Sequence, residues 1–578
     1  MESMPATVGG QGPSLAEDPA LGLSHRQKLE ILGAVLLALF LGALDQTVVS
    51  TAMPQILTDL NGSALYTWVV TIYLLTSTIT VPFYGKLSDL FGRKPLLMFG
   101  ISVFLIGSAL SGLSQTMEQL IIFRGLQGIG AGALFPISLA VIGDLFSPQE
   151  RGRYQGLFGA VFGLSFILGP AIGGLLTDYA SWHWVFFVNI PIGIISLIVI
   201  WRLLPTVRRP DADRNIDFLG GGVFAVAISF LLVGLTNKSG LSSAGIPNEW
   251  TDFTVGGFLL IALVLSAIFL FIESRAKEPI VPLSLWRDRT YASSIVSTFL
   301  ISFGFFGAII FLPRWFQVVR GESATLSGYL LFPLLIGLIG SSIVSGIIVS
   351  RTGRYKVLVM SGIAIMAIGL VLMHQLTATT EYPAMFLWMF VTGVGIGPTL
   401  SVFTIIVQNA VPFSMLGVAT SNLTFFRQIG GTVGLAIAGT VFGNALLNRL
   451  PTEIVASLPP ALQPQAQQML SSGSGFNVNP NDLTGVGQSF GAAVAAQVPA
   501  LQPLIPNLDQ AFHQAMSLSI ADTFVIGIIT AGLAFIASLF MRELPLRATN
   551  SAPVATQGME GAGADGGTPR FRESPVTD

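Results

Sequence analysis

The chain has 578 residues, of which 52% are hydrophobic and only 10% are charged, and its formal net charge is −2. Soluble domains carry roughly 25% charged residues, and soluble cores stop growing near about 250–300 residues, so this composition excludes an ordinary water-soluble protein. The charge balance also argues against a nucleic-acid partner, which needs clustered Lys and Arg. The absence of Cys excludes disulfides, Cys-ligated metals and thiol nucleophiles.

Long apolar segments follow one another along almost the whole chain. A helix needs about 20 mostly apolar residues to cross the bilayer, because each residue rises about 1.5 Å. The first segment begins near Glu30 and has no small-residue cleavage site after it, so we expect it to be retained as a span. The sequence predicts an all-α integral membrane protein with fourteen spans, near residues 30–52, 65–84, 96–114, 119–144, 154–176, 184–204, 218–237, 253–273, 291–315, 326–350, 356–376, 383–408, 417–446 and 518–541.

Lys and Arg are distributed unevenly between the loops. With fourteen spans, Arg124 and Arg427 lie within spans, and nearly all other Lys and Arg residues face one side of the membrane. Only four face the opposite side, namely Lys238, Arg314, Arg320 and Arg449. Because Lys and Arg are retained on the cytoplasmic side, we expect a multi-pass protein of the inner or plasma membrane with both termini cytoplasmic.

Three segments are expected to lie outside the bilayer. Residues 1–29 form a cytoplasmic tail, and the small, polar, Gly-rich residues 542–578 are expected to be disordered. Residues 448–516, which are rich in Gln, Pro, Ala and Ser, form an outer-face loop with a predicted helix around Pro460–Leu470. A periplasmic or extracellular partner is one candidate ligand of this loop.

An internal repeat relates the two ends of the chain. The glycines and the arginine of G-K-L-S-D-L-F-G-R-K, which follows the second span, recur in G-I-I-V-S-R-T-G-R-Y after the tenth span. Three glycines of the fourth span, Gly128, Gly130 and Gly132, likewise recur as Gly393, Gly395 and Gly397 of the twelfth. Each glycine alone is typical of close helix packing, but their recurrence in register predicts two equivalent six-helix bundles, residues 30–204 and 291–541. Residues 205–290 then form a linker with two additional spans.

Four sequence motifs resemble those of the major facilitator superfamily, and within it the fourteen-span drug:proton antiporters of the EmrB/QacA type. The loop after the second span is similar to the superfamily's G-x-L-x-D-x-x-G-R signature, with Gly85, Asp89, Gly92 and Arg93 at the matching positions. I-F-R-G-L-Q-G-I-G-A-G resembles the fourth-span motif around Arg124. The fifth span resembles the antiporter motif at Gly156, Gly169, Pro170, Gly173 and Gly174. Ser165 stands where the motif has another glycine. A-L-D-Q-T-V-V-S-T-A-M-P-Q-I, which contains Asp45, is similar to the first-span signature, and W-H-W-V-F-F-V-N-I-P-I-G supports it.

The resemblance implies two pseudo-symmetric bundles around a central cavity that opens to one side at a time. It also implies a monomer that exchanges a small molecule for protons across a lipid bilayer and needs no cofactor or metal. No G-x-x-x-x-G-K-[ST] phosphate cradle occurs in the sequence, so the energy is expected to come from the proton gradient. By resemblance, Asp89 and Arg93 belong to a cytoplasmic gate.

Only three ionisable residues lie well inside the predicted spans: Asp45, Arg124 and Arg427. Burying such a group costs about 2.5–3.5 kcal/mol on insertion scales, so each is a functional candidate. Asp45 and Arg124 are predicted at similar depths, about 10 Å and 8 Å from the outer face. We hypothesise that Asp45 is the proton-coupling carboxylate. The alternatives are a permanent Asp45–Arg124 pair that only locks helices, and for Arg427 a structural anchor bonded to backbone carbonyls.

The expected function is proton-coupled export of hydrophobic or amphipathic, cationic compounds, that is, multidrug efflux. An enzyme is disfavoured, since neither H-E-x-x-H nor G-x-S-x-G occurs. Two alternatives stay open: an exporter of a lipid, siderophore or amino acid, and a receptor or assembly protein that uses the outer loop. Candidate polar groups of the substrate cavity are Gln127, Gln317, Gln408 and Asn409.

Overall fold

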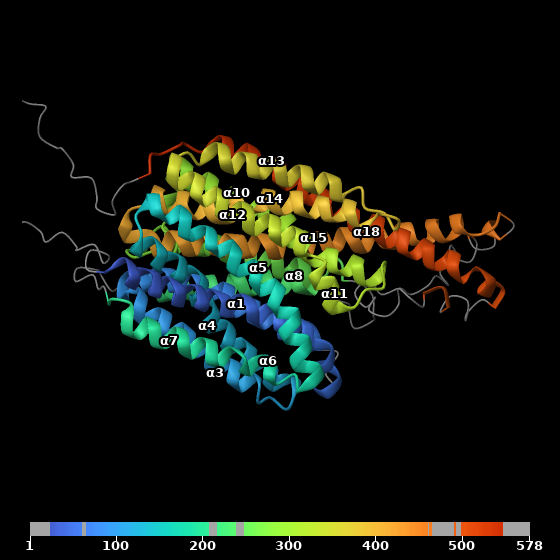
Figure 1. Ribbon diagram of the computed structural model, residues 1–578, viewed down its shortest axis with the longest axis horizontal. Coiled ribbons are helices and arrows are strands. Elements are labelled where there is room, and N and C mark those ends of the chain that lie inside the picture. The colour runs from blue at the N-terminus through green and yellow to red at the C-terminus, as the bar shows by residue number, and fades with distance from the viewer. Residues whose placement is uncertain are drawn as a thin grey trace, which may run out of the picture.

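The computed structural model of the protein describes residues 23–60, 65–206, 217–238, 248–460 and 499–546, together with the short stretches 462–464, 467 and 490–492. All regular secondary structure in these residues is helical, which confirms the predicted all-α fold (Figure 1). Fourteen helical segments are long and apolar enough to cross a membrane, as the sequence predicted.

The first six spans form the N-terminal half of the bundle. Its sixth span is built from two consecutive helices, α6 and α7. The helices are α1 (His25–Leu60), α2 (Tyr66–Phe91), α3 (Arg93–Ser111), α4 (Met117–Leu145), α5 (Pro148–Tyr179), α6 (Trp184–Phe187) and α7 (Asn189–Leu203).

The two additional spans are α8 (Phe218–Lys238) and α9 (Phe258–Glu273), the latter preceded by the π-helical turn η2 (Phe253–Gly257). The 3₁₀ turn η3 (Leu283–Arg287) leads into the C-terminal half. That half contains α10 (Arg289–Val318), α11 (Ala324–Tyr329), α12 (Phe332–Thr352), α13 (Lys356–Met373), α14 (Tyr382–Ala410), η4 (Phe413–Met415), α15 (Leu416–Ser457), η5 (Pro499–Leu504) and α18 (Ile505–Leu539).

Equivalent helices pair in the same way in both halves. In the N-terminal half α1 packs on α5, and α2 and α3 pack on α4; in the C-terminal half α10 packs on α15, and α12 and α13 pack on α14. The repeated glycines serve this packing. A Cβ atom on Gly128 would lie 2.5 Å from the Tyr73 carbonyl oxygen of α2, and one on Gly393 would lie 2.0 Å from the Leu334 carbonyl oxygen of α12. The internal repeat in the sequence is therefore a repeat of close helix contacts.

The two halves meet along two seams, one between α2 and α15 and the other between α5 and α12. Figure 1 shows the blue-to-cyan N-terminal half below the yellow-to-orange C-terminal half. We call the end of the bundle that holds Gly85–Lys94 the basic end, because most Lys and Arg residues of the sequence belong to loops at this end.

The two additional spans cover the seam between α2 and α15. Helix α8 contacts α9, α2 and α15. The Phe224 ring of α8 lies 6.1 Å from the Phe83 ring of α2, 5.1 Å from the Phe269 ring of α9 and 5.2 Å from the Phe425 ring of α15. This apolar contact places the additional spans beside both halves at once, which the sequence did not predict.

Helices α15 and α18 project beyond the rest of the bundle at the end opposite the basic end (Figure 1). The sequence predicted that the thirteenth span ends near residue 446 and that the fourteenth begins near residue 518. In the structure α15 continues to Ser457 and α18 begins at Ile505. The prediction was too short because polar residues lower the hydropathy beyond residue 446. The helix continues because a stripe of apolar residues with four-residue spacing stays buried against α18, namely Leu446, Leu450, Ile454 and Leu458. Most of the helix expected around Pro460–Leu470 lies outside the described residues, as do residues 1–22 and 547–578.

Candidate functional site

Asp45 and Arg124 form an ion pair inside the N-terminal half. Asp45 lies on α1 and Arg124 on α4, and their residues are 1% and 2% exposed. Arg124 Nη1 donates to Asp45 Oδ2 over 2.6 Å. The similar depth predicted for the two residues is therefore matched by direct contact. Their predicted role in proton coupling is not decided by this contact.

Two amides complete the surroundings of Asp45. Gln127 Nε2 and Asn189 Nδ2 donate to Asp45 Oδ1 over 2.7 Å and 3.1 Å. Gln127 also accepts from Arg124 Nη1 over 2.8 Å, and Asn189 also donates to the Ser108 hydroxyl over 3.1 Å. Three helices, α1, α4 and α7, thus meet at one carboxylate, α3 joins them through Ser108 and Asn189, and both carboxylate oxygens accept hydrogen bonds from protein donors.

Asn189 was missed as a site residue by the sequence analysis. It begins α7 and belongs to the stretch W-H-W-V-F-F-V-N-I-P-I-G that supported the resemblance. A neutral amide gives no charge signal in a hydropathy plot, so only its depth at the start of the sixth span could have indicated it. Gln127, which was expected in the substrate cavity, uses its side-chain amide to bond Asp45 and Arg124.

Glycines of the antiporter motif hold α5 against α1 beside Asp45. A Cβ atom on Gly169 would lie 2.1 Å from Thr47 Oγ1, and one on Gly173 would lie 2.9 Å from the Val48 carbonyl oxygen. The other motif residues face the C-terminal half: Gly156 packs closely on Ile343 of α12, Gly174 faces Thr325 at an ordinary distance, and Pro170 lies beside Gly328. Two glycines therefore let α5 pack closely on the helix that carries the carboxylate.

Asp89 connects the two halves at the basic end. It lies near the end of α2, and its two oxygens accept the backbone N–H groups of Gly417 and Val418 over 3.0 Å and 2.8 Å. These N–H groups belong to the first turn of α15, where the helix dipole favours a negative charge. An acidic side chain of the N-terminal half thus caps a helix of the C-terminal half.

Arg93 and two glycines support this cap. Arg93 bonds Asp89 over 2.6 Å and also Asp144 of α4 over 2.9 Å. A Cβ atom on Gly85 would lie 1.9 Å from Ser421 Oγ and 2.7 Å from the Gly417 carbonyl oxygen, so α2 and α15 touch at their backbones. Gly92 joins α2 to α3 with φ +96°, a conformation that glycine adopts without strain. Gly85, Asp89 and Arg93 therefore lie at one contact between the halves, which we call the Asp89 latch, and Gly92 forms the turn beside it.

At the second seam, the described contacts join small residues of α5 and α12. A Cβ atom on Gly152 of α5 would lie 2.2 Å from the Gly346 carbonyl oxygen of α12, and Ser342 donates to the Gly156 carbonyl oxygen over 3.3 Å. Ser350, which corresponds to Asp89 in the repeat, donates to the Ile347 carbonyl oxygen of its own helix over 3.0 Å. The pseudo-symmetry is thus kept in the glycine contacts and broken in the charges.

The remaining cavity candidates are scattered. Gln408 accepts from Gln155 over 2.7 Å, which adds a buried amide contact between the halves at the basic end. Asn409 donates to the Pro545 carbonyl oxygen over 3.3 Å, and Gln317 donates to the Ser327 hydroxyl over 2.8 Å. This conformation does not bring these three side chains together, and their expected role in substrate binding stays a prediction.

Arg427 lies on α15 where the two halves face each other. Its Nη2 is 3.5 Å from the Leu400 carbonyl oxygen of α14, and its guanidinium carbon is 5.8 Å from the Phe158 ring centroid of α5. The Leu400 contact agrees with the carbonyl-anchor alternative, but it is long for a hydrogen bond.

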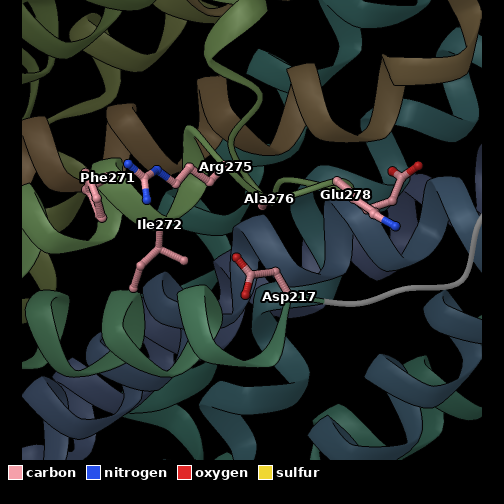
Figure 2. A pocket seen from close by; sticks show the side chains of 7 residues that line it. Asp217, Phe271, Ile272, Arg275, Ala276 and Glu278 are labelled. Atoms are coloured by element: carbon pink, nitrogen blue, oxygen red, sulfur yellow. The ribbon is translucent and has the colours of Figure 1, made fainter.

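A cavity of about 440 Å³ lies at the basic end, between the start of α8 and the end of α9 (Figure 2). Figure 2 shows Asp217 reaching toward the turn after α9 from the start of α8. Nearby, Glu278 pairs with Lys86 of α2 over 2.5 Å, which ties the additional spans to the loop of the Asp89 latch. The cavity contains none of the predicted site residues; its lining is Asp217, Phe271, Ile272, Arg275, Ala276, Lys277 and Glu278.

Known proteins with similar sequences and folds agree with this architecture. Residues 35–435 match the family model of the Major Facilitator Superfamily. The chain is 36% identical to the multidrug transporter protein MdtP of Bacillus subtilis, covering 91% of this chain and 95% of the relative. It is 35% identical to multidrug resistance protein 3 of the same species, covering 90% and 96%. The proton:xylose symporter XylE superposes with a TM-score of 0.56 at 13% identity, covering 91% of this chain and 98% of XylE, and shares the fold. The chain therefore belongs to the major facilitator superfamily, and it is a membrane transporter rather than an enzyme.

Proposed function

We propose that this transporter is a proton-coupled exporter of hydrophobic or amphipathic compounds that works by alternating access between residues 30–204 and 291–541. The names of the two Bacillus relatives, which are a multidrug transporter and a multidrug resistance protein, support export of foreign compounds. The charge of those compounds stays a prediction. We place the basic end in the cytoplasm, with both termini, because Lys and Arg concentrate there.

The observation that carries proton coupling is the buried carboxylate of Asp45. Arg124, Gln127 and Asn189 all donate to this carboxylate inside the membrane-spanning region. A proton on Asp45 would remove that charge and weaken the contact with Arg124, since charge-assisted hydrogen bonds are about twice as strong as neutral ones. Protonation would thereby loosen α1 from α4 and α7, and deprotonation would restore the contact.

Alternating access follows from the seams. In the present conformation the Asp89 latch and the contact between Gly152 and Gly346 close the basic end. Opening toward the cytoplasm must break both contacts, because each joins the two halves. We propose that loosening of α1 around protonated Asp45 and opening of the latch alternate, so that a proton and a compound occupy the protein in turn.

The proton gradient can supply enough energy for this exchange. One charge crossing 100 mV releases about 2.3 kcal/mol, which corresponds to roughly a fiftyfold concentration ratio of an exported neutral compound.

Asp45→Asn tests the proposal in proteoliposomes with an imposed pH gradient. Asparagine keeps the shape but cannot carry the exchangeable proton. We expect loss of uphill export of a lipophilic dye, with retention of dye exchange between the two sides in the absence of a gradient. Asp522→Asn is the matched control, because Asp522 lies near the start of the predicted fourteenth span, pairs with Arg449 and is partly exposed. Full gradient-driven export by Asp45→Asn would refute the proposal.

The same experiment separates coupling from a structural lock. If Asp45 and Arg124 only fix the helices, Asp45→Asn loses gradient-driven export and dye exchange together, and its thermal unfolding shifts to lower temperature. Retained exchange with lost coupling supports the proposal alone.

A further inference from the structure

Arg427 is a cation within a membrane-spanning helix that has no acidic partner among the described residues. In the part of the chain that the structure describes, every ion pair is formed by a basic residue other than Arg427. Its guanidinium lies near the Phe158 ring and the Leu400 carbonyl oxygen. Arg124, the other cation predicted deep in a span, is matched by Asp45. The two sites therefore differ: one charge is cancelled and the other is not.

A small cavity of about 10 Å³ adjoins Arg427, between α10, α14 and α15. Three hydroxyl side chains face it, from Thr298, Ser302 and Thr399. The Ser302 hydroxyl donates to the Thr298 carbonyl oxygen and the Thr399 hydroxyl to the Ile396 carbonyl oxygen, so both protons are used within the helices. The Thr298 hydroxyl is buried and has no hydrogen-bond partner among the described residues, although the residue is only 3% exposed.

Arg427 and Thr298 both supply donors that lack a close acceptor, while the Thr298, Ser302 and Thr399 hydroxyl oxygens also keep acceptor lone pairs. Arg427 offers N–H groups and a positive charge but no acceptor, and Thr298 retains a free O–H group. The buried Thr298 hydroxyl is costly without a partner, and the half-buried Arg427 charge has no counter-charge among the described residues. Such a cluster is satisfied by an oxygen that accepts from both residues, most strongly when that oxygen carries negative charge.

The charges of the surrounding spans point the same way. Of the three ionisable residues predicted deep in the spans, Asp45 and Arg124 cancel, which leaves the positive charge of Arg427 where the two halves meet. In a low-dielectric interior this charge repels a cationic ligand and attracts an anionic one.

We propose that Arg427 and Thr298 form a substrate subsite for an acidic group, such as a carboxylate, sulfonate or phosphate, on an otherwise hydrophobic compound. This inference rests on the proposed export function and specifies its substrate class, in place of the cationic compounds expected from the sequence. The cavity has room for about one water-sized group. In the present conformation it accepts a single ligand oxygen, and the apolar remainder of the compound occupies the space that opens when Phe158 moves away with the N-terminal half.

Three dyes with one skeleton test the proposal: diphenylhexatriene, its trimethylammonium derivative and its propionate derivative. Everted membrane vesicles that contain the full chain are energised, and the loss of membrane fluorescence gives the initial rate for each dye. We expect the propionate dye to be moved at least about threefold faster than the trimethylammonium dye. Arg427→Gln should slow the propionate dye by roughly tenfold or more, because a charge-assisted hydrogen bond is lost, and should not slow the trimethylammonium dye.

Two further variants keep the test decisive. Thr298→Val should reduce the propionate rate with little change for the uncharged dye, and it serves if Arg427→Gln fails to fold. Arg449→Gln is the matched control, because Arg449 lies on the same helix in the projecting part and should leave the dye preference unchanged.

The possible failures are distinguishable. The subsite is overturned if the trimethylammonium dye moves faster than the propionate dye and neither Arg427→Gln nor Thr298→Val changes the ratio of the two rates. This result leaves the proposed export function intact. Absence of gradient-dependent movement of all three dyes overturns both.

Discussion

Gly85→Ala should open the Asp89 latch without removing any charge. The new Cβ atom would lie 1.9 Å from Ser421 Oγ and 2.7 Å from the Gly417 carbonyl oxygen. The serine side chain can rotate away, but the carbonyl oxygen belongs to the backbone of α15, so α2 and α15 must separate by several tenths of an ångström. Overpacking of this kind costs about 1–3 kcal/mol. Because the clash exists only while the two helices touch, this cost shifts the equilibrium toward the conformation open at the basic end by roughly 5- to 150-fold.

The chain contains no Cys, so spin labels can be attached to introduced pairs without background. Gln149→Cys at the start of α5 and Thr352→Cys at the end of α12 are both exposed at the basic end, on opposite halves. Electron–electron distance measurements should give a longer distance in Gly85→Ala than in the parent protein. Gly439→Ala is the control, since a Cβ atom there meets nothing within 4 Å. An unchanged distance distribution in Gly85→Ala would contradict the latch.

Three other perturbations have defined outcomes. Asp89→Asn removes the charge that faces the first turn of α15, which should favour the open basic end by about 1–2 kcal/mol in the same distance measurement; no shift would mean that the charge is not part of the latch. Lys86→Glu and Glu278→Lys should each lower the export rate, and the double variant, which exchanges the two charges, should restore it. The coupling free energy from the double-mutant cycle should be less than about 1 kcal/mol, because both side chains are partly exposed. Asn189→Leu removes one donor to Asp45 and should destabilise the protein by about 1–2 kcal/mol in thermal unfolding followed by tryptophan fluorescence, and an unchanged midpoint would show that this hydrogen bond contributes nothing.

Much of the fold could be predicted because the bilayer imposes strong rules. Span length and the uneven distribution of Lys and Arg predicted fourteen helices, and the glycine repeat predicted two equivalent halves. The projecting ends of α15 and α18 could not be found in this way. Beyond about residue 446 the helix is held by a buried stripe of Leu and Ile against α18 rather than by lipid, so its hydropathy falls while its helical period continues.

The candidate site was predictable where it carries charge and not where it is neutral. Asp45 and Arg124 were recognisable because charged residues are costly inside a span. Asn189, Ser421 and Gly417 were not, since amides, hydroxyls and glycines are common in membrane helices and acquire their roles only through partners distant in the sequence. The position of the additional spans over the seam of α2 and α15 likewise depends on tertiary contacts among Phe83, Phe224 and Phe425.

The central claim is that transport of a compound and movement of a proton are obligatorily opposed. The most direct measurement uses proteoliposomes that contain the purified chain and a trapped pH-sensitive dye, with no ion gradient at the start. Addition of a transported compound on one side should drive protons in the opposite direction, and this proton movement should vanish in Asp45→Asn. Compound movement without any proton signal in the parent protein would contradict the account.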